Sequence, residues 1–356
     1  MERLPATADK IDAAWLTQAL GARYPQVRVA RVEVVERHEA TNAHARLRVA
    51  YHEPAGAPTA IFCKLLPSDP ARRPAVARTG MGPREALFYE RLAPALAMRV
   101  PDAYFARHDA RDGSFLLGIE DLVGSGCTVS DGPTGVAPVA AARALEDLAE
   151  LHVHFEEPAR REAEAAWVPA PLHDRSYGSA LLATGLAHHR DRLSTQFAAI
   201  AELYIEKGEV LHELWQAGPK TVIHGDPHVG NLFDDHGRTG FLDWGILHLG
   251  TPLRDVGYFL CMALSIEDRR RHERDLLRHY LDARAQRGGI PIGFDEAWRA
   301  HRLHAAYTVV ASCQIVSFPA QVSPGRRIFS DAFLARAEAA IADLEARAAL
   351  RAFGGL

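Results

Sequence analysis

Alternation of apolar and polar residues in the first third of the chain predicts β-strands. The segments 32–37, 45–51 and 59–65 alternate or run apolar, and breakers such as Pro54 and Gly56 fall between them. We therefore expect a small antiparallel sheet near the start of the chain.

Helical spacing replaces this alternation further along. Apolar residues recur at helical positions over 83–93, where Pro83 suits a first helical turn and Pro94 would end the helix. Two more strands are expected at 103–108 and 114–120, because a turn rich in Asp and Gly separates them. The first third thus predicts strands around one helix.

The rest of the chain is mostly helical by its pattern. A stretch rich in glycine and proline over 124–138 marks a break between lobes. Helices are expected over 140–154, over 179–217 and from 254 to the end, with a short strand interlude at 220–243. The predicted fold class is α+β, with a sheet lobe followed by a mostly helical lobe.

The strand interlude contains a β-hairpin. Residues 238–242 pair with 231–234 across Asp235-His236-Gly237, a turn that ends in glycine. Polar residues gather in and beside this hairpin, so it is expected to carry the chemistry.

Composition narrows the function by exclusion. The 356 residues are 48% apolar and 24% charged, which suits a globular protein of two lobes. A net charge of -4 provides no cationic field for non-specific nucleic-acid binding. Residues 1–10 have neither the basic region nor the apolar region expected of a secretory leader, and no run approaches about 20 apolar residues. We therefore expect a soluble cytoplasmic protein, without a nucleic-acid or membrane partner, whose four widely spaced cysteines are mostly buried thiols.

The main chemical signal is the sequence HGDPHVGN at 224–231, followed twelve residues later by Asp243. Phosphoryl transfer needs a carboxylate that orients the attacking hydroxyl, and oxygen ligands that hold magnesium against the phosphates. Magnesium takes one or two carboxylates and keeps several waters. In this interpretation Asp226 accepts or aligns the hydroxyl proton, while Asn231 and Asp243 ligate the metal.

The histidines allow another interpretation. His224 and His228 could bind zinc together with Asp226, but spacing of four residues brings two histidines together only on a helix. Glycine and proline between them disfavour a helix, so His224 is expected to orient the loop through hydrogen bonds. His152 and His154, on the predicted helix 140–154, are expected to face solvent or to be satisfied locally.

The motif resembles that of the aminoglycoside phosphotransferase and choline kinase-like family, which has the protein-kinase-like fold. Its hallmark H-G-D-x-x-x-x-N followed by D-W is matched residue for residue. The resemblance implies ATP and Mg2+ as cofactors, Asp226 as the catalytic aspartate, and Asn231 and Asp243 as metal ligands. It also implies a nucleotide-binding lobe at 1–122 and a catalytic, substrate-binding lobe at 123–356.

Other positions resemble the same family. Lys64 resembles the lysine that contacts the nucleotide phosphates, and Glu85 its helix partner; a buried lysine also needs a carboxylate nearby to keep its charge. The backbone around Glu120 and Leu122 resembles the hinge that bonds an adenine edge. Asp255, in the sequence PLRDVG, resembles the residue that braces the catalytic loop.

The expected phosphate-covering loop departs from the usual pattern. It lies at 39–44 and contains no glycine, although many phosphate loops use glycine to let backbone N–H groups approach. Thr41 and Asn42 are its candidate nucleotide contacts.

The acceptor is the least defined part of the prediction. A polycationic aminoglycoside would favour a site lined by carboxylates. The segment 260–356 contains fourteen Arg and Lys against eleven Asp and Glu, so it has no acidic surplus. Aromatic residues such as Tyr307, Phe329 and Phe333 would suit a partly apolar alcohol. The alternative interpretation is that they form the helical core.

The sequence therefore favours an ATP- and Mg-dependent kinase that acts on a hydroxyl group of a small metabolite or antibiotic. An antibiotic acceptor would make it a resistance enzyme. The alternative is a nucleotide-binding pseudoenzyme or regulatory protein on the same fold. A protein kinase is less favoured, because no activation-loop or A-P-E signature lies between Asp243 and Asp255.

Overall fold

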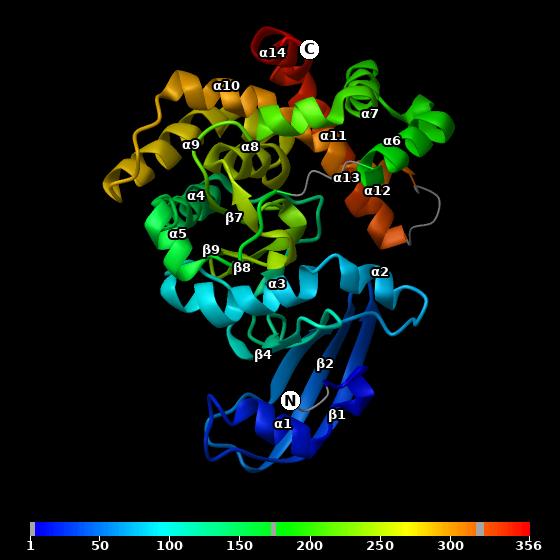
Figure 1. Ribbon diagram of the computed structural model, residues 1–356, viewed down its shortest axis with the longest axis vertical. Coiled ribbons are helices and arrows are strands. Elements are labelled where there is room, and N and C mark those ends of the chain that lie inside the picture. Colours follow the sequence, from blue (N-terminus) through cyan, green and yellow to red (C-terminus); the bar gives the residue numbers. More distant parts are fainter. Residues whose placement is uncertain (1–3, 172–175, 318–323) are drawn as a thin grey trace. The chain divides into compact units, whose positions relative to one another are not determined.

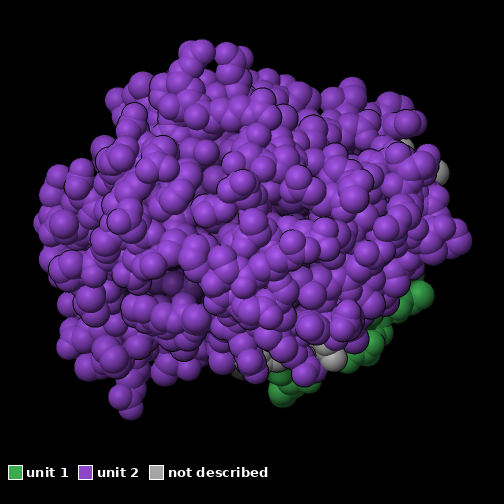
Figure 2. All heavy atoms as spheres, turned by 90° about the horizontal axis from the view of Figure 1, so that it is seen from above, with its two compact units in different colours: residues 1–128, 240–246 green, residues 129–239, 247–356 purple. Residues whose placement is uncertain are grey.

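The computed structural model describes residues 4–171, 176–317 and 324–356. It divides the chain into two compact units, drawn in Figure 1 and coloured separately in Figure 2. Unit 1 consists of Met1–Thr128 and Gly240–Ile246, and unit 2 of Val129–Thr239 and Leu247–Leu356. Seven residues from late in the chain thus group with the N-terminal unit.

Unit 1 is built on a five-stranded antiparallel sheet in the order β1-β2-β3-β5-β4. Its elements are η1 (Ala8–Lys10), α1 (Ala13–Leu20), β1 (Arg28–Glu39), β2 (Ala43–Glu53), β3 (Ala60–Leu65), α2 (Arg73–Arg78), α3 (Met81–Leu87), η2 (Phe88–Leu92), η3 (Ala93–Ala95), β4 (Ala103–Asp109), β5 (Ser114–Glu120) and the late η6 (Trp244–Ile246). The antiparallel sheet predicted from the alternation is confirmed, and so are its five strands.

Alternation along the strands divides the sheet into two faces. In β3 the side chains of Ile61, Cys63 and Leu65 enter the core of unit 1, so Lys64 points to the opposite face. Helix α1 covers the core face; its first turn is capped by Asp12, whose carboxylate accepts a hydrogen bond from Trp15 N–H at 2.8 Å. The sheet therefore presents Lys64 on the face that α1 does not cover.

The helix predicted over 83–93 is shorter and less regular than expected. Helix α3 ends at Leu87, a π-helix (η2) follows, and a 3-10 turn (η3) contains Pro94. Proline lacks an N–H and cannot continue the α-helical ladder, which accounts for the end but not for the π-helix.

Unit 2 is mostly helical. Its elements are α4 (Pro138–His154), α5 (Pro158–Glu164), α6 (Ser176–His189), η4 (Arg190–Arg192), α7 (Thr195–Trp215), β7 (Thr221–Ile223), η5 (Val229–Asn231), β8 (Leu232–Asp235), β10 (His248–Gly250), α8 (Pro252–Ala263), α9 (Ile266–Gln286), α10 (Phe294–Ala305), α11 (Tyr307–Ala311), α12 (Cys313–Ser317), α13 (Pro324–Asp343) and α14 (Ala346–Gly354). Two short strands, β6 (Thr128–Val129) and β9 (Arg238–Phe241), include the residues at which the chain passes between units.

The mostly helical stretch predicted over 179–217 is confirmed, and it consists of α6 and α7 with the short η4 turn between them. Ser194 caps the second helix by accepting a hydrogen bond from Phe197 N–H at 3.2 Å. The predicted hairpin is confirmed as β8 and β9, joined by His236 and Gly237. Both turn residues have positive φ, as a two-residue hairpin turn requires.

Helix α8 is the central element of unit 2. All twelve of its residues are buried, and Tyr258, Cys261 and Met262 belong to an apolar core of this unit. The four cysteines are buried and none of them forms a disulfide, in line with the sequence. Among the described residues, no helix is both long and apolar enough to cross a membrane.

Candidate active site

In unit 1, Lys64 forms a buried cluster with two carboxylates. Its Nζ lies 2.7 Å from Glu85 Oε2 and 3.0 Å from Asp243 Oδ1. Lys64 and Glu85 are almost fully buried, whereas 46% of the Asp243 side chain is exposed. The structure thus brings together three residues that are far apart in sequence, with one carboxylate open to further ligands.

Burial and charge act against each other in this cluster. Burial lowers the pKa of Lys64, but the negative charges of Asp243 and Glu85 raise it above its ordinary value. Burial raises the pKa of Glu85 to about 7, and the positive charge of Lys64 offsets only part of that effect. Lys64 therefore stays cationic at neutral pH.

Asp243 is held in an uncommon backbone conformation. Its φ of 59° lies in the left-handed region, which residues other than glycine rarely adopt. The next residue anchors it: the Trp244 ring stacks on Phe88 with centroids 3.8 Å apart, and the adjacent Gly245 C=O accepts a hydrogen bond from Arg84 at 2.8 Å. Packing of the neighbours thus stabilises the strained backbone position of Asp243.

In unit 2, the loop 224–231 places Asp226 and Asn231 side by side. Gly225 has a φ of 88°, which permits the turn before Asp226. Asn231 Nδ2 donates to the Asp226 carbonyl at 3.0 Å and to Asp226 Oδ2 at 3.1 Å. These bonds fix the amide so that Asn231 Oδ1 is turned away from Asp226.

Two histidines hold the same loop. His224 Nδ1 accepts a hydrogen bond from Asp226 N–H at 3.2 Å, the loop-orienting contact expected of it. His228 Nδ1 accepts from Gly230 N–H at 2.9 Å, so its proton resides on Nε2, which lies 3.4 Å from Asp226 Oδ2. Asp226 Oδ2 therefore faces both Asn231 and His228. No hydrogen bond of ordinary geometry from the described residues reaches Asp226 Oδ1.

Asp255 braces the loop from the first turn of α8. Its Oδ2 accepts from His224 N–H at 2.6 Å, and its Oδ1 accepts from Gly225 N–H at 2.9 Å. Asp255 is fully buried; burial raises its pKa, but the hydrogen bond and charge of His152 lower it below the ordinary value. A buried carboxylate thus satisfies two backbone amides next to Asp226.

His152 is a supporting residue that the sequence interpretation missed. It is fully buried, with Nε2 3.3 Å from Asp255 Oδ2 and Nδ1 2.8 Å from Tyr280 Oη. It therefore neither faces solvent nor is satisfied locally. His154 lies 2.8 Å from Glu164, ten residues away, as a locally satisfied histidine would.

Aromatic and cationic groups surround the loop. The His228 ring meets Phe333 edge-on at 5.1 Å and Phe329 at 6.2 Å. Buried Arg254 donates to the Gly225 carbonyl at 3.3 Å and lies over the Tyr307 ring at 4.2 Å. The part of unit 2 next to Asp226 is therefore aromatic and, on one side, positively charged.

The predicted hinge residues end β5 in unit 1. Glu120 N–H donates to the Asp102 carbonyl at 2.8 Å, and its carboxylate pairs with Arg99 at 3.0 Å. The buried Leu122 accepts Cys127 N–H at 2.9 Å through its carbonyl. Its N–H makes no hydrogen bond within the described residues, so Leu122 has a backbone donor available and Glu120 does not.

The predicted phosphate loop is a tight turn. The pairing of Glu39 with Ala43 leaves only three residues between β1 and β2. Thr41 is exposed, whereas Asn42 is buried, and no described residue bonds its Oδ1. Next to it, burial and then the charge of Lys64 lower the pKa of His44 to about 4, so this imidazole is neutral.

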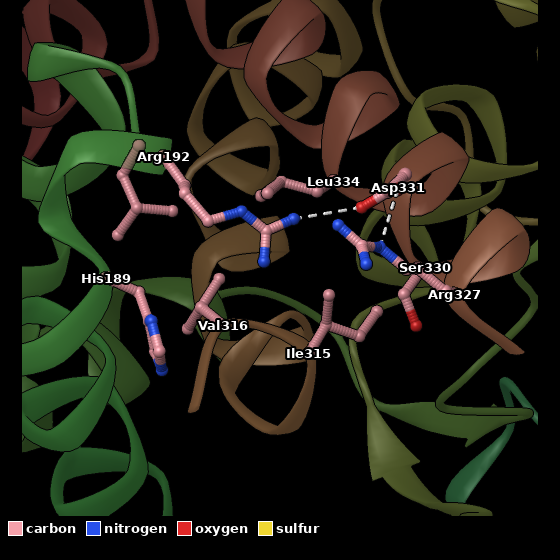
Figure 3. A pocket seen from close by; sticks show the side chains of 9 residues that line it. His189, Arg192, Ile315, Val316, Arg327, Ser330, Asp331 and Leu334 are labelled. Atoms are coloured by element: carbon pink, nitrogen blue, oxygen red, sulfur yellow. Dashed lines mark hydrogen bonds and ion pairs between the residues drawn. The ribbon is translucent and has the colours of Figure 1, made fainter. Parts of the chain in front are cut away.

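A narrow crevice elsewhere in unit 2 lies between the end of α6, α12 and α13. Apolar side chains from Leu193, Val316 and Leu334 line it, and Arg192 and Arg327 both point toward Asp331 (Figure 3). Arg192 lies 3.0 Å from Asp331 Oδ1. No residue of the motif at 224–231 lines this crevice.

The residues predicted to bind metal fit Mg2+ in their chemistry. Asn231 Oδ1 and the partly exposed Asp243 carboxylate are hard oxygen donors, as Mg2+ prefers. Within the described ranges, no three His, Cys, Asp or Glu side chains gather in a way that could hold a metal ion.

The chain matches one known family by sequence. The profile of the phosphotransferase enzyme family aligns with residues 71–304, which include every motif residue from Glu85 to Asp255. Lys64 and the loop at 40–42 precede the matched range. No curated protein matches the chain.

Several solved structures share the fold. A putative aminoglycoside phosphotransferase from Ralstonia eutropha has a TM-score of 0.52 at 15% identity, covering 92% of this chain and 98% of its own. Choline kinase LicA from Streptococcus pneumoniae has a TM-score of 0.51 at 13% identity, with coverages of 93% and 97%. The GDP complex of aminoglycoside 2'-phosphotransferase-IIIa has a TM-score of 0.50 at 15% identity, with coverages of 94% and 99%. These likenesses confirm the two-lobed kinase-like α+β fold.

Proposed function

The chain belongs to the phosphotransferase enzyme family, and from that membership we propose that it transfers the γ-phosphoryl group of ATP to a hydroxyl group of a small molecule. One observation carries the proposal. Asp226 Oδ2 faces Asn231 and His228, while the described residues make no hydrogen bond of ordinary geometry to Oδ1. A carboxylate with one oxygen fixed and one open is arranged to accept a proton from an acceptor hydroxyl.

The proposed proton path is short. The acceptor hydroxyl donates its hydrogen to Asp226 Oδ1, which aligns the oxygen for attack on the phosphorus. As the new P–O bond forms, the proton passes to Asp226. Asn231 and His228 keep the carboxylate plane fixed, because both lie against Oδ2.

Lys64, Asn231 and Asp243 would hold the nucleotide and its metal. We assign Lys64 to the phosphates, with Glu85 keeping it in place, and Asn231 and Asp243 to Mg2+. Bound Mg2+ supplies charge neutralisation of the phosphates. A GDP complex of a protein with the same fold supports a nucleotide site, although GDP is that protein's ligand.

The contacts to the nucleobase and the phosphate loop are assigned from fewer observations. Leu122 N–H is the backbone donor we assign to the nucleobase edge, with Glu120 limited to shaping the end of β5. Thr41 and Asn42 lie in the turn between β1 and β2, and of these two residues only Thr41 is exposed. We assign the whole turn, including both residues, to contact with the nucleotide phosphates.

The surroundings of Asp226 favour a neutral, partly apolar alcohol over a polycation. His228, Phe329 and Phe333 form an aromatic group beside the carboxylate, and Arg254 adds a positive charge nearby. A substrate with several ammonium groups would instead need carboxylates around the reacting hydroxyl. The aromatic group thus supports an acceptor with an apolar face next to its hydroxyl.

The test is a screen of hydroxylated metabolites and antibiotics with ATP and MgCl2, read by the mass gain of one phosphoryl group. With an acceptor in hand, Asp226→Asn should lower turnover by about 100-fold or more, the usual contribution of a positioned acid–base group. Removing Mg2+ with a chelator should abolish turnover. Asp282→Asn is the matched control, because Asp282 is exposed on α9.

The outcomes separate enzyme from pseudoenzyme. Unchanged turnover in Asp226→Asn would contradict the role of Asp226 as base. Nucleotide binding without transfer to any acceptor would instead support a regulatory protein on this scaffold.

A further inference from the structure

Tyr258 lies in the middle of α8, one turn after the residues that brace the catalytic loop. Its position three residues after Asp255 and four after Arg254 places it on the same side of the helix as both. Arg254 and Asp255 both bond the loop backbone at 224–225. Tyr258 therefore belongs to the helix face that contacts the loop carrying Asp226.

The hydroxyl group of Tyr258 is buried without a well-formed hydrogen bond. The residue is 1% exposed, and its Oη makes no hydrogen bond of ordinary geometry with the described residues. A buried hydroxyl in that condition is unfavourable, and native proteins seldom keep one. Simple packing would be served better by phenylalanine at this position.

The Tyr258 hydroxyl nevertheless interacts with the Asp226 carboxylate, although without ordinary hydrogen-bond geometry. Burial raises the pKa of Tyr258 well above its ordinary value. The negative charge of Asp226 raises this pKa further, and so does a hydrogen-bonding contact between Tyr258 and the same carboxylate. The Tyr258 ring also meets His228 edge-on at 6.3 Å, and His228 Nε2 lies 3.4 Å from Asp226 Oδ2. The phenol, the imidazole and the carboxylate thus form one group.

We propose that Tyr258 is a positioning residue of phosphoryl transfer, whose O–H donates to the Asp226 carboxylate when the acceptor is bound. The inference rests on the proposed function, since it needs Asp226 to act as the base. Asn231 and His228 fix the carboxylate through Oδ2, and Tyr258 adds a third donor that limits its rotation. Oδ1 then keeps its orientation toward the acceptor hydroxyl.

Tyr258 keeps its own proton throughout. The hydrogen of the acceptor hydroxyl goes to Asp226, and the electron pair of that O–H bond forms the new P–O bond. The ADP oxygen takes the electrons of the bond that breaks. Tyr258 therefore changes only the geometry and hydrogen bonding of the base.

The first test is Tyr258→Phe, which removes one oxygen atom. We expect kcat to fall about tenfold or more, the usual effect of losing a hydrogen bond to a charged group. KM for ATP and for the acceptor should stay within about twofold, because neither ground-state contact is removed. Tyr204→Phe is the matched control: Tyr204 is a buried tyrosine of the same core, and its Oη bonds His212 Nε2 at 2.8 Å instead.

The second test is a double-mutant cycle with Asp226→Ala. If Tyr258 acts through Asp226, then Tyr258→Phe should have no further effect on the residual turnover of Asp226→Ala. Equal effects of Tyr258→Phe in both backgrounds would overturn the proposal, as would unchanged kcat in the single variant. Full turnover in Asp226→Ala would instead refute the proposed function, so the two failures are distinguishable.

Discussion

Asp255→Asn offers the sharpest test of how the loop 224–231 is held. The substitution keeps the shape of the side chain but replaces one oxygen with an NH2 group. Three donors face the carboxylate: His224 N–H and His152 at Oδ2, and Gly225 N–H at Oδ1. An Asn NH2 in the Oδ2 position would face two donors, so we expect it in the Oδ1 position, where it faces only Gly225.

The cost follows from those contacts. Leaving the buried Gly225 N–H without an acceptor costs about 1–3 kcal/mol. The two remaining bonds to Asn lose the charge of the acceptor, at about 1 kcal/mol each, the difference between charged and neutral hydrogen bonds. The free energy of unfolding should therefore fall by about 3–5 kcal/mol, similar to breaking a buried pair.

Urea unfolding followed by circular dichroism measures this loss, with Asp282→Asn as control. The control should stay within about 0.5 kcal/mol of the parent, as exposed substitutions usually do.

The pKa of Asp255 in the folded protein is below its ordinary 3.8, so the stability from its charge is present above that pH and is lost only as the pH falls further. The difference between parent and variant should thus be constant from pH 8 to pH 5.

An Asp255→Asn protein as stable as the parent would refute this account of the loop. So would a difference that disappears between pH 8 and pH 5, since the Asp255 carboxyl stays ionised across that range in the folded protein.

Two further predictions concern other buried groups. Lys64→Ala should fold but bind ATP more weakly, because the cation that Glu85 and Asp243 share is lost from the proposed phosphate site. Equilibrium binding measures the affinity for ATP. An unchanged affinity would remove Lys64 from the site. Burial lowers the pKa of His304 from 6.5 to about 4, so the unfolded chain binds a proton more readily and stability should fall as the pH drops from 6.5 to 4. The loss from this group should be at most about 3 kcal/mol, at 1.36 kcal/mol per pKa unit. His304→Gln should reduce the loss between pH 7 and pH 4.5 in urea unfolding; an undiminished loss would exclude His304 as its source.

Local patterns predicted much of the fold. The strands of unit 1 and the β8–β9 hairpin follow from alternation and from turn residues, which act over short distances. The motif at 224–231 and Asp243 could be found because phosphoryl transfer restricts both residue types and spacing. Their assignment to catalysis and metal binding stays a prediction.

Other features depend on contacts distant in sequence. His152 is 103 residues from Asp255, and nothing next to it indicates that bond. Its burial could have been inferred, since Leu148 and His152 share one apolar side of α4. Tyr258 lies within a run of apolar residues, where a tyrosine is indistinguishable from a core residue until its hydroxyl is located.

Unit 1 consists of two stretches that are far apart in the sequence, and this affects how the chain can fold during its synthesis. Phe88 and Lys64 lie in the first segment, yet their partners Trp244 and Asp243 belong to Gly240–Ile246. A fragment that stops at residue 128 would expose the Phe88 ring face and leave Lys64 with Glu85 alone. The N-terminal unit is therefore complete only after more than a hundred residues of unit 2 have been synthesised, so this chain cannot fold strictly one unit at a time from its N-terminus.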